Sequence, residues 1–422
     1  MLIDRIAGAR VAGATGLCAL DLRDGRVAEV ALEGEREAGH EGEHEGERRP
    51  SPAEVTLEAA GRVVLPAFVD AHVHLDKAFL LADAEAAGPL RPTLDAAIAS
   101  VGALRASLAP ARVRAIAERA ITRLVRHGVT AARVHVEIDP AVGLDLVHLH
   151  KALADTAARR LALQLVAFPQ RGLELPGMID LFGAAMGLGL DVVGGCPYVD
   201  ADPRRHLDLV FAMAERHGAP VDLHLDFSDD PGRSLLGLVA ERTRAHGMQG
   251  RVAIGHVTTL AAMPPDAQAE ALDLLAACGI ALIALPATDL YLTGHGEPGA
   301  RSLAPWERAR QRGVRVAIAN NNLGNPFAPF GNGNILQAAW LAGITRHACG
   351  PESRAALLDA VTQAPAAILG LPEHGPRVDA AAHLVIVDTE EPEDVILEAP
   401  TVLTTLRAGA VVHETHPPRI AH

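Results

Sequence analysis

The sequence predicts an α/β protein, a (β/α)8 TIM barrel with a small β-sandwich domain formed from both ends of the chain. Its 422 residues exceed the length of a bare barrel, which leaves room for a second domain. Eight short runs rich in strand-forming residues alternate with helical patterns. The runs are Arg62–Val69, Ala131–Ile138, Leu161–Phe168, Leu190–Val193, Pro220–Leu225, Arg251–Ile254, Ile280–Leu285 and Val314–Ile318.

Helical patterns fill most of the gaps between these runs, including Pro110–His127, Arg204–His217, Pro264–Cys278 and Pro305–Arg312. A glycine follows each of them: Gly128, Gly218, Gly279 and Gly313. Glycine is the residue that most often ends a helix in the left-handed conformation. A doubly wound open sheet is the structural alternative, but no GxGxxG follows the first run to support its nucleotide-binding form.

Both ends of the chain lie outside the eight runs. Their strand-like pieces are Arg26–Leu32, Ala382–Asp388 and Thr401–Val412. We therefore expect residues 1–62 and 376–422 to form the small β-domain and residues 63–375 to form the barrel. The segment Glu33–Pro52 repeats Glu, Gly, His and Arg, and we expect a solvated loop there because it cannot bury apolar surface.

Composition narrows the class of function. The chain carries 38 Lys and Arg against 52 Asp and Glu, a net charge of −14, which argues against nucleic-acid or anionic-membrane partners. Four separated cysteines with no CxxC imply neither a disulfide framework nor a cysteine zinc site. Charges at Asp4 and Arg5 oppose a signal peptide, and no apolar run is long enough to span a membrane. We expect a cytoplasmic protein, and the apolar composition leaves room for a homo-oligomer.

Histidines gather where the predicted strands end. His72 and His74 stand two residues apart at the end of the first run, so both side chains point to one face of a strand. His224 closes the fifth run and His256 closes the sixth. In a barrel these positions converge at the carboxyl mouth, where active sites lie, and imidazole is a ligand for first-row metals. His135 lies within the second run, where we favour a structural role.

Several segments resemble the amidohydrolase superfamily, and more closely its cytosine deaminase-like branch. They are LPAFVDAHVHLDK at 65–77, AFPQ at 167–170, HLD at 224–226, GHVTT at 255–259, NPFAPFGNGN at 325–334 and AAHLVIVD at 381–388. The resemblance covers nearly the whole chain, and its motifs are specific to the superfamily without specifying a substrate.

The resemblance implies a metal-dependent hydrolase. In this reading His72, His74 and His224 hold one divalent metal ion, Zn or Fe, and His256 lies beside the water that the metal activates. Gln170 matches a glutamine that contacts substrate. The implied reaction is hydrolysis of a C–N bond, by deamination or by amide or amidine hydrolysis, in a small, cyclic, nitrogen-rich substrate.

At two positions this chain has a different residue type from the one that the cytosine deaminase-like branch implies. The resemblance places an Asp after the eighth strand, where this chain has Asn321, and a Glu three residues after His224, where it has Phe227. An Asn amide can offer an oxygen to a metal but is not a base at neutral pH. A replacement proton carrier is therefore expected, and the candidates are His256, Asp226, Asp229, Asp230 and Lys77. We assign catalytic roles to His256, Asp226 and Asn321.

Four residues on the predicted mouth loops are candidate substrate contacts. Lys77 is one of only two lysines and ends the first histidine motif, and Gln170 follows the third run. Asp289 follows the seventh run, and Asn322 belongs to the Asn-rich run Asn320–Asn334. The expected partner is a small-molecule substrate.

Two other functions remain open. Loss of both hydrolytic carboxyl positions motivates a non-hydrolytic metal-dependent lyase or isomerase on the same fold. A catalytically inactive ligand-binding relative is the third possibility, which the retained histidines oppose.

Overall fold

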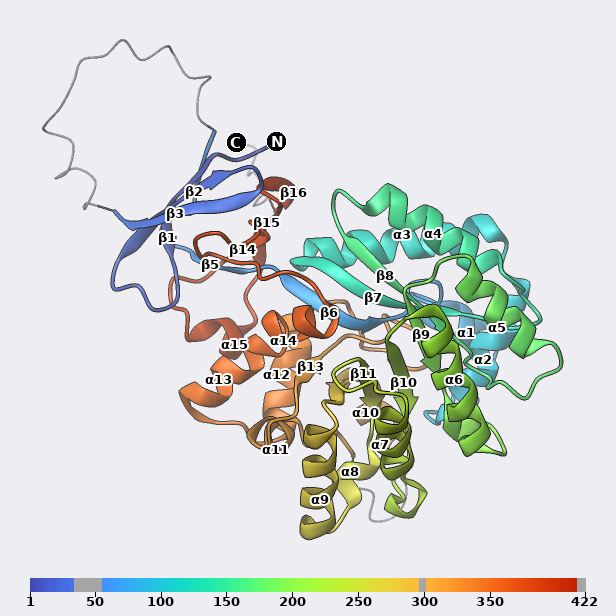
Figure 1. Cartoon of the computed structure of the whole chain (residues 1–422). Coiled ribbons are helices and arrows are strands. Elements are labelled where there is room, and N and C mark those ends of the chain that lie inside the picture. Colours follow the sequence, from blue (N-terminus) through green and yellow to red (C-terminus); the bar gives the residue numbers. More distant parts are fainter. Residues whose placement is uncertain (34–54, 296–300, 416–422) are drawn as a thin grey trace, which may run out of the picture.

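The structure, a computed structural model, describes residues 1–33, 55–295 and 301–415. It contains two eight-stranded sheets, one parallel and one mixed. Figure 1 shows the parallel sheet surrounded by helices, with the mixed sheet, which holds the first and the last strands of the chain, lying to one side. We expect a solvated loop at Glu33–Pro52, but all of this segment except Glu33 lies outside the described residues.

The parallel sheet follows chain order from β6 to β13. Its strands are β6 (Phe68–Val73), β7 (Val129–Glu137), β8 (Ala162–Phe168), β9 (Val192–Gly195), β10 (Val221–Leu225), β11 (Val252–His256), β12 (Ala281–Ala284) and β13 (Val316–Ile318). A parallel bridge between Val73 and Asn321 joins the last strand of this order to the first. The prediction of a (β/α)8 barrel is thereby confirmed, and the open-sheet alternative is not.

The first predicted run covers parts of two strands. Val63–Pro66 forms β5, which pairs with β14 and β1 of the mixed sheet, and β6 begins only at Phe68. Pro66 has no N–H to continue a ladder, so the chain can leave one sheet there and enter the other. As a result His72 lies inside β6 and His74 directly follows it.

Helices cover the outside of the barrel and part of its mouth. They are α1 (Leu81–Ala87), α2 (Leu94–Ser107), α3 (Pro110–Arg126), α4 (Asp145–Ala157), α5 (Met178–Gly187), α6 (Pro203–His217), α7 (Leu236–Ala245), α8 (Thr259–Ala262), α9 (Pro265–Ala277), α10 (Pro286–Leu292), α11 (Trp306–Gln311), α12 (Ile335–Thr345), α13 (Gly350–Asp359), α14 (Gln363–Ile368) and α15 (Asp394–Glu398), with 3-10 turns at Pro197–Val199 and Pro231–Arg233. The four predicted helices match within one residue at each end. Within the described ranges, none of the helices has both the length and the apolar character to cross a bilayer.

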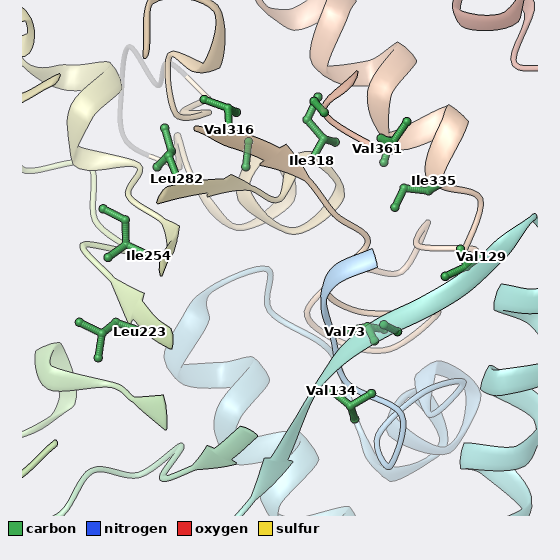
Figure 2. Close-up of a cluster of buried hydrophobic side chains, with 14 of the residues drawn as sticks. Val73, Val129, Val134, Leu223, Ile254, Leu282, Val316, Ile318, Ile335 and Val361 are labelled. Atoms are coloured by element: carbon green, nitrogen blue, oxygen red, sulfur yellow. The ribbon is translucent and has the colours of Figure 1, made fainter. Parts of the chain in front are cut away.

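Side chains alternate between the two faces of the barrel wall. Val134, Leu223, Ile254 and Leu282 point outward from β7, β10, β11 and β12 into the layer beneath the helices (Figure 2). The opposite face carries small residues, which pack together inside the barrel: Ala131, Ala253, Ala281, Ala317 and Ala319. These alanines leave interior volume, and the buried Arg133 and several histidines occupy it.

The mixed sheet combines both ends of the chain in the order β16–β15–β14–β5–β1–β2–β3, with β4 paired to β1. Its strands are β1 (Arg5–Arg10), β2 (Leu17–Arg23), β3 (Arg26–Leu32), β4 (Thr56–Glu58), β5, β14 (Leu384–Val387), β15 (Val402–Arg407) and β16 (Ala410–Glu414). The prediction of a β-domain drawn from both ends is confirmed. The domain boundaries at residues 62 and 376 stay a prediction, although β5 lies in this sheet.

Candidate active site

Two barrel strands bring three histidines together. Nε2 of His72 on β6 lies 3.1 Å from Nε2 of His224 on β10, and Nε2 of His74 lies 3.3 Å from the same His224 atom. All three side chains are buried. Burial, reinforced by the neighbouring cationic groups and imidazoles, holds the pKa of each far below its usual value, so the rings are neutral.

The donor set fits a divalent metal. Neutral imidazoles whose Nε2 lone pairs converge repel one another unless a cation or a proton lies between them. A Zn–N bond of about 2.0–2.1 Å in a tetrahedral site separates the nitrogens by about 3.3–3.4 Å, close to the 3.1 and 3.3 Å found between these atoms. The ligand atoms of these three histidines all lie within 4.8 Å of one another. These three histidines could hold the metal, and His72, His135 and Asp222 form a second group of converging donors.

His256 reaches the cluster through an unusual backbone. On β11, Ala253 faces the barrel interior and Ile254 faces the helices, so regular alternation would turn His256 outward. Instead His256 and Val257 have φ values of 71° and 49°, and the His256 ring lies 5.3 Å from that of His224 between centroids. Gly255 makes room, because a Cβ there would lie 3.2 Å from the His72 ring.

Asp289 lies behind His256. Its Oδ1 is 2.6 Å from His256 Nδ1, and its Oδ2 accepts a hydrogen bond from the Leu285 N–H at 3.2 Å. The carboxylate belongs to the first turn of α10 and is fully buried. Burial raises the pKa of Asp289, with the His256 contact opposing that shift. The structure shows this carboxylate bonded to the imidazole, and the substrate contact that the sequence suggests at Asp289 stays a prediction.

Asp226, predicted to be catalytic, is occupied by other contacts. Its Oδ1 accepts from the Leu235 N–H at 2.9 Å, and its Oδ2 accepts from the hydroxyls of Ser234 and Thr259 at 2.6 and 3.1 Å. These bonds hold the loop that follows β10, and the catalytic role of Asp226 stays a prediction. Asp229 and Asp230 accept bonds from backbone groups and a serine on the same side of the barrel.

The two departures from the resemblance both lie in the site. Asn321 donates its N–H to the His72 carbonyl at 2.8 Å and accepts from the His74 N–H at 2.9 Å, which ties the end of β13 to both histidines. The Phe227 ring stands edge-on to the His256 ring, 4.7 Å away between centroids. An apolar wall therefore borders the imidazole on the side where the resemblance implies a carboxylate.

An asparagine network supports this end of the barrel. Asn322 donates to Asn321 Oδ1 at 2.9 Å and accepts from Asn325 Nδ2 at 2.8 Å. Asn325 also donates to the Lys77 carbonyl at 3.0 Å. The amide of Asn322, predicted to contact substrate, is thus engaged on both sides with its neighbours.

Lys77 and Gln170 meet beside the cluster. The Lys77 ammonium donates to Gln170 Oε1 at 3.0 Å and lies 4.7 Å from the centroid of the Phe327 ring. Among the described residues it forms no ion pair, which leaves two of its three N–H donors unused by protein. Burial lowers the pKa of Lys77 to about 8, with Glu137 opposing the shift.

A cavity of about 240 Å³ adjoins Lys77, Gln170 and Phe327. Its wall includes α2, whose Arg105 pairs with both Asp76 and Glu137. Helix α2 also contributes Ala97 and Val101 to an apolar cluster with Phe227 and Phe327. This helix therefore covers the mouth of the barrel beside the histidines.

Beneath the cluster lies an ion pair that we did not predict from the sequence. Asp222 accepts from Arg133 Nη1 at 2.7 Å, and its other oxygen lies 3.2 Å from His135 Nε2. The His135 ring in turn packs against His72, with centroids 3.8 Å apart. Burial opposes ionisation of Asp222, but His135 and Arg133 outweigh it and lower its pKa. Alternation along β10 would have revealed this, because Asp222 shares a face with His224.

Comparison with known proteins agrees with this geometry. A model of the Amidohydrolase family matches residues 78–413. A pterin deaminase of Rhizobium rhizogenes is 27% identical over 376 residues, which cover 87% of this chain and 84% of that protein. An N-isopropylammelide isopropyl amidohydrolase of Pseudomonas sp. is 25% identical over 374 residues, 84% of this chain and 87% of that protein.

Solved structures give the same result for the fold. The crystal structure of a 5-methylcytosine deaminase from Klebsiella pneumoniae, liganded with phosphonocytosine, superposes with a TM-score of 0.87 at 28% identity. The alignment covers 99% of this chain and 100% of that one.

Proposed function

The chain belongs to the amidohydrolase family and is a hydrolase of C–N bonds, and on that premise we propose that it removes an amino substituent from a small, planar nitrogen heterocycle. One observation carries the proposal: three neutral, buried imidazoles converge through Nε2 at 3.1 and 3.3 Å, and a fourth histidine stands beside them with its own carboxylate.

His72, His74 and His224 would hold a single divalent ion, Zn or Fe. Such an ion, when bound, lowers the pKa of water toward neutrality and polarises the carbon that is attacked. The neutral state of these three rings supports this assignment, because only the unprotonated nitrogen ligates.

We assign proton transfer to the pair His256 and Asp289. Asp289 holds the proton on His256 Nδ1, so Nε2 is free to accept a proton from the attacking water. Asp289 then stabilises the imidazolium, and Nε2 returns the proton to the departing nitrogen. This pair replaces the carboxylates that the chain lacks at Asn321 and Phe227.

Lys77 and Gln170 are assigned to substrate binding. A buried ammonium with two unused donors favours an acceptor such as a ring carbonyl, and Gln170 can offer its amide N–H groups to the same edge. The Phe327 ring provides a face on which a planar heterocycle can pack. The similar proteins are named for a pterin, for N-isopropylammelide and for 5-methylcytosine, and all three are nitrogen heterocycles.

The experiment is an assay in ¹⁸O-labelled water with amino-substituted pterins, pyrimidines and triazines. We expect one labelled oxygen in the ring product for each amine released, and we expect no turnover by His72→Ala. If a substrate is converted and its product carries no ¹⁸O, this would contradict hydrolysis and would favour the lyase or isomerase alternative.

A further inference from the structure

Helix α12 is apolar on every side. Of its eleven residues, Ile335–Thr345, only Gln337 and Thr345 are polar. A helix that is hydrophobic all round is normally covered all round. One side of α12 packs in the barrel core through Ile335, Leu336 and Ala339. The other side is open in the single chain.

The open side borders a cavity. Trp340 is 43% exposed and Ile344 is 55% exposed. Together with α10 and α15, this side of α12 lines a groove of about 950 Å³, whose opposite edge carries Leu397, 52% exposed. We call the surface formed by the groove-lining residues Phe330, Trp340 and Leu397, together with Ile344 one helical turn after Trp340, the α12 face. Contiguous exposed apolar surface of this kind marks an interaction site.

The α12 face also carries a projection. Phe330 is 86% exposed at the groove's rim. The backbone of the next residue packs closely on the chain beside it, because a Cβ on Gly331 would lie 2.0 Å from the Asn322 carbonyl oxygen. A knob and a groove on one surface are self-complementary, since a two-fold axis can seat each copy's Phe330 in the other copy's groove.

Charge favours a second copy over a charged partner. Among the described residues that line the groove, two carry a charge, Arg301 and Glu398, and their charges have opposite signs. Neither forms a salt bridge within the part of the chain that the structure describes. On a chain with a net charge of −14, this neutral face is a surface where two copies can meet without strong repulsion.

We propose that the α12 face is the contact between two copies of this chain, related by a two-fold axis that packs α12 against its counterpart. The contact covers the apolar side of α12 and inserts Phe330 of each copy between α10 and α15 of the other. It adjoins α10, the helix that carries Asp289.

Sedimentation velocity on the full chain tests the proposal. The wild type is expected at twice 44.1 kDa, and Ile344→Glu is expected at the monomer mass. Val378→Glu is the matched control, because Val378 is 53% exposed, does not line the groove, and precedes Asp379, which bonds to Val27 of β3 in the mixed sheet. Far-UV circular dichroism shows that both variants are folded. A monomeric wild type, or an Ile344→Glu variant as oligomeric as Val378→Glu, would overturn the proposal.

Tryptophan fluorescence gives a second measurement. The chain has two tryptophans; Trp306 is fully buried and Trp340 is not, so a concentration-dependent change in emission reports Trp340. Dilution of the wild type is expected to shift the emission to the red. Phe330→Ala is expected to move the midpoint of that shift to roughly tenfold higher concentration. Emission that is independent of concentration in a wild type shown to be monomeric would contradict the contact.

Discussion

Nδ1 of His256 lies 2.6 Å from Oδ1 of the fully buried Asp289. A carboxylate on Nδ1 selects the tautomer in which the proton stays on that nitrogen and leaves Nε2 as the acceptor. Among the described acidic residues, Asp289 is the one bonded to this imidazole. In the proposed mechanism it supplies the charge that is absent at Asn321 and Phe227.

Asp289→Asn should therefore reduce turnover while leaving the metal in place. The amide keeps the shape of the side chain but loses the charge that stabilises the imidazolium. We expect kcat to fall by roughly 10²–10⁴-fold, measured with the substrate identified in the labelled-water assay. Asp229→Asn, which alters a loop carboxylate, serves as control and should stay near wild type. Equal turnover by the two variants would remove Asp289 from the mechanism.

Deprotonation of Lys77 should lower kcat/KM at alkaline pH. The pKa of this residue is lowered to about 8 by burial, so the ammonium that donates to substrate is present below that pH and is lost above it. We expect kcat/KM to fall as pH rises through about 8. Lys77→Met should raise KM more than it lowers kcat and should flatten this fall. A fall that persists in the variant belongs to another group.

Arg133→Met should destabilise the fold strongly. Arg133 and Asp222 form a buried ion pair at 2.7 Å. Removal of the guanidinium leaves a buried carboxylate whose remaining partner is the His135 imidazole, and burial lowers the pKa of that ring, which opposes its charged form. The free energy of unfolding should fall by about 3–5 kcal/mol, measured by chemical denaturation. Arg114→Met breaks an exposed pair with Glu118 and should cost less than about 1 kcal/mol. Similar losses in both variants would argue against this account of the barrel interior.

Gly128→Ala tests the junction between the two sheets. Gly128 has φ of 83°, and a Cβ there would lie 2.8 Å from the Phe68 ring and 2.9 Å from the Val385 side chain. Backbone strain and overpacking together should lower the free energy of unfolding by about 2–4 kcal/mol. Gly237→Ala, in α7 with open space around it, should change stability by less than about 1 kcal/mol. A Gly128→Ala variant as stable as Gly237→Ala would contradict this packing.

Features that depend on the local pattern of apolar and polar residues could be predicted from the sequence. The alternation of strands and helices located seven of the eight barrel strands, and the spacing of His72, His74 and His224 predicted their meeting at the mouth. The first strand was displaced because Pro66 divides one apolar run between two sheets. No periodicity marks such a division when both halves are equally apolar.

The roles of the acidic residues depended on three-dimensional packing. Asp226 and Asp289 both follow barrel strands, and their sequences do not tell them apart. Hydrogen bonds from Ser234, Leu235 and Thr259 engage the first, whereas the turn of α10 places the second against His256. The inward position of His256 depends on a positive φ, which a non-glycine residue rarely adopts and a sequence pattern does not predict.

Metal content of the purified chain is the measurement that bears on the three-histidine site without an intermediate step. We expect close to one divalent ion per chain in the wild type. We expect loss of that ion in His74→Ala and in His224→Ala, and retention in His148→Ala, which removes an exposed imidazole on α4. A metal-free wild type with full activity, or undiminished metal in His74→Ala and His224→Ala, would contradict the three-histidine site.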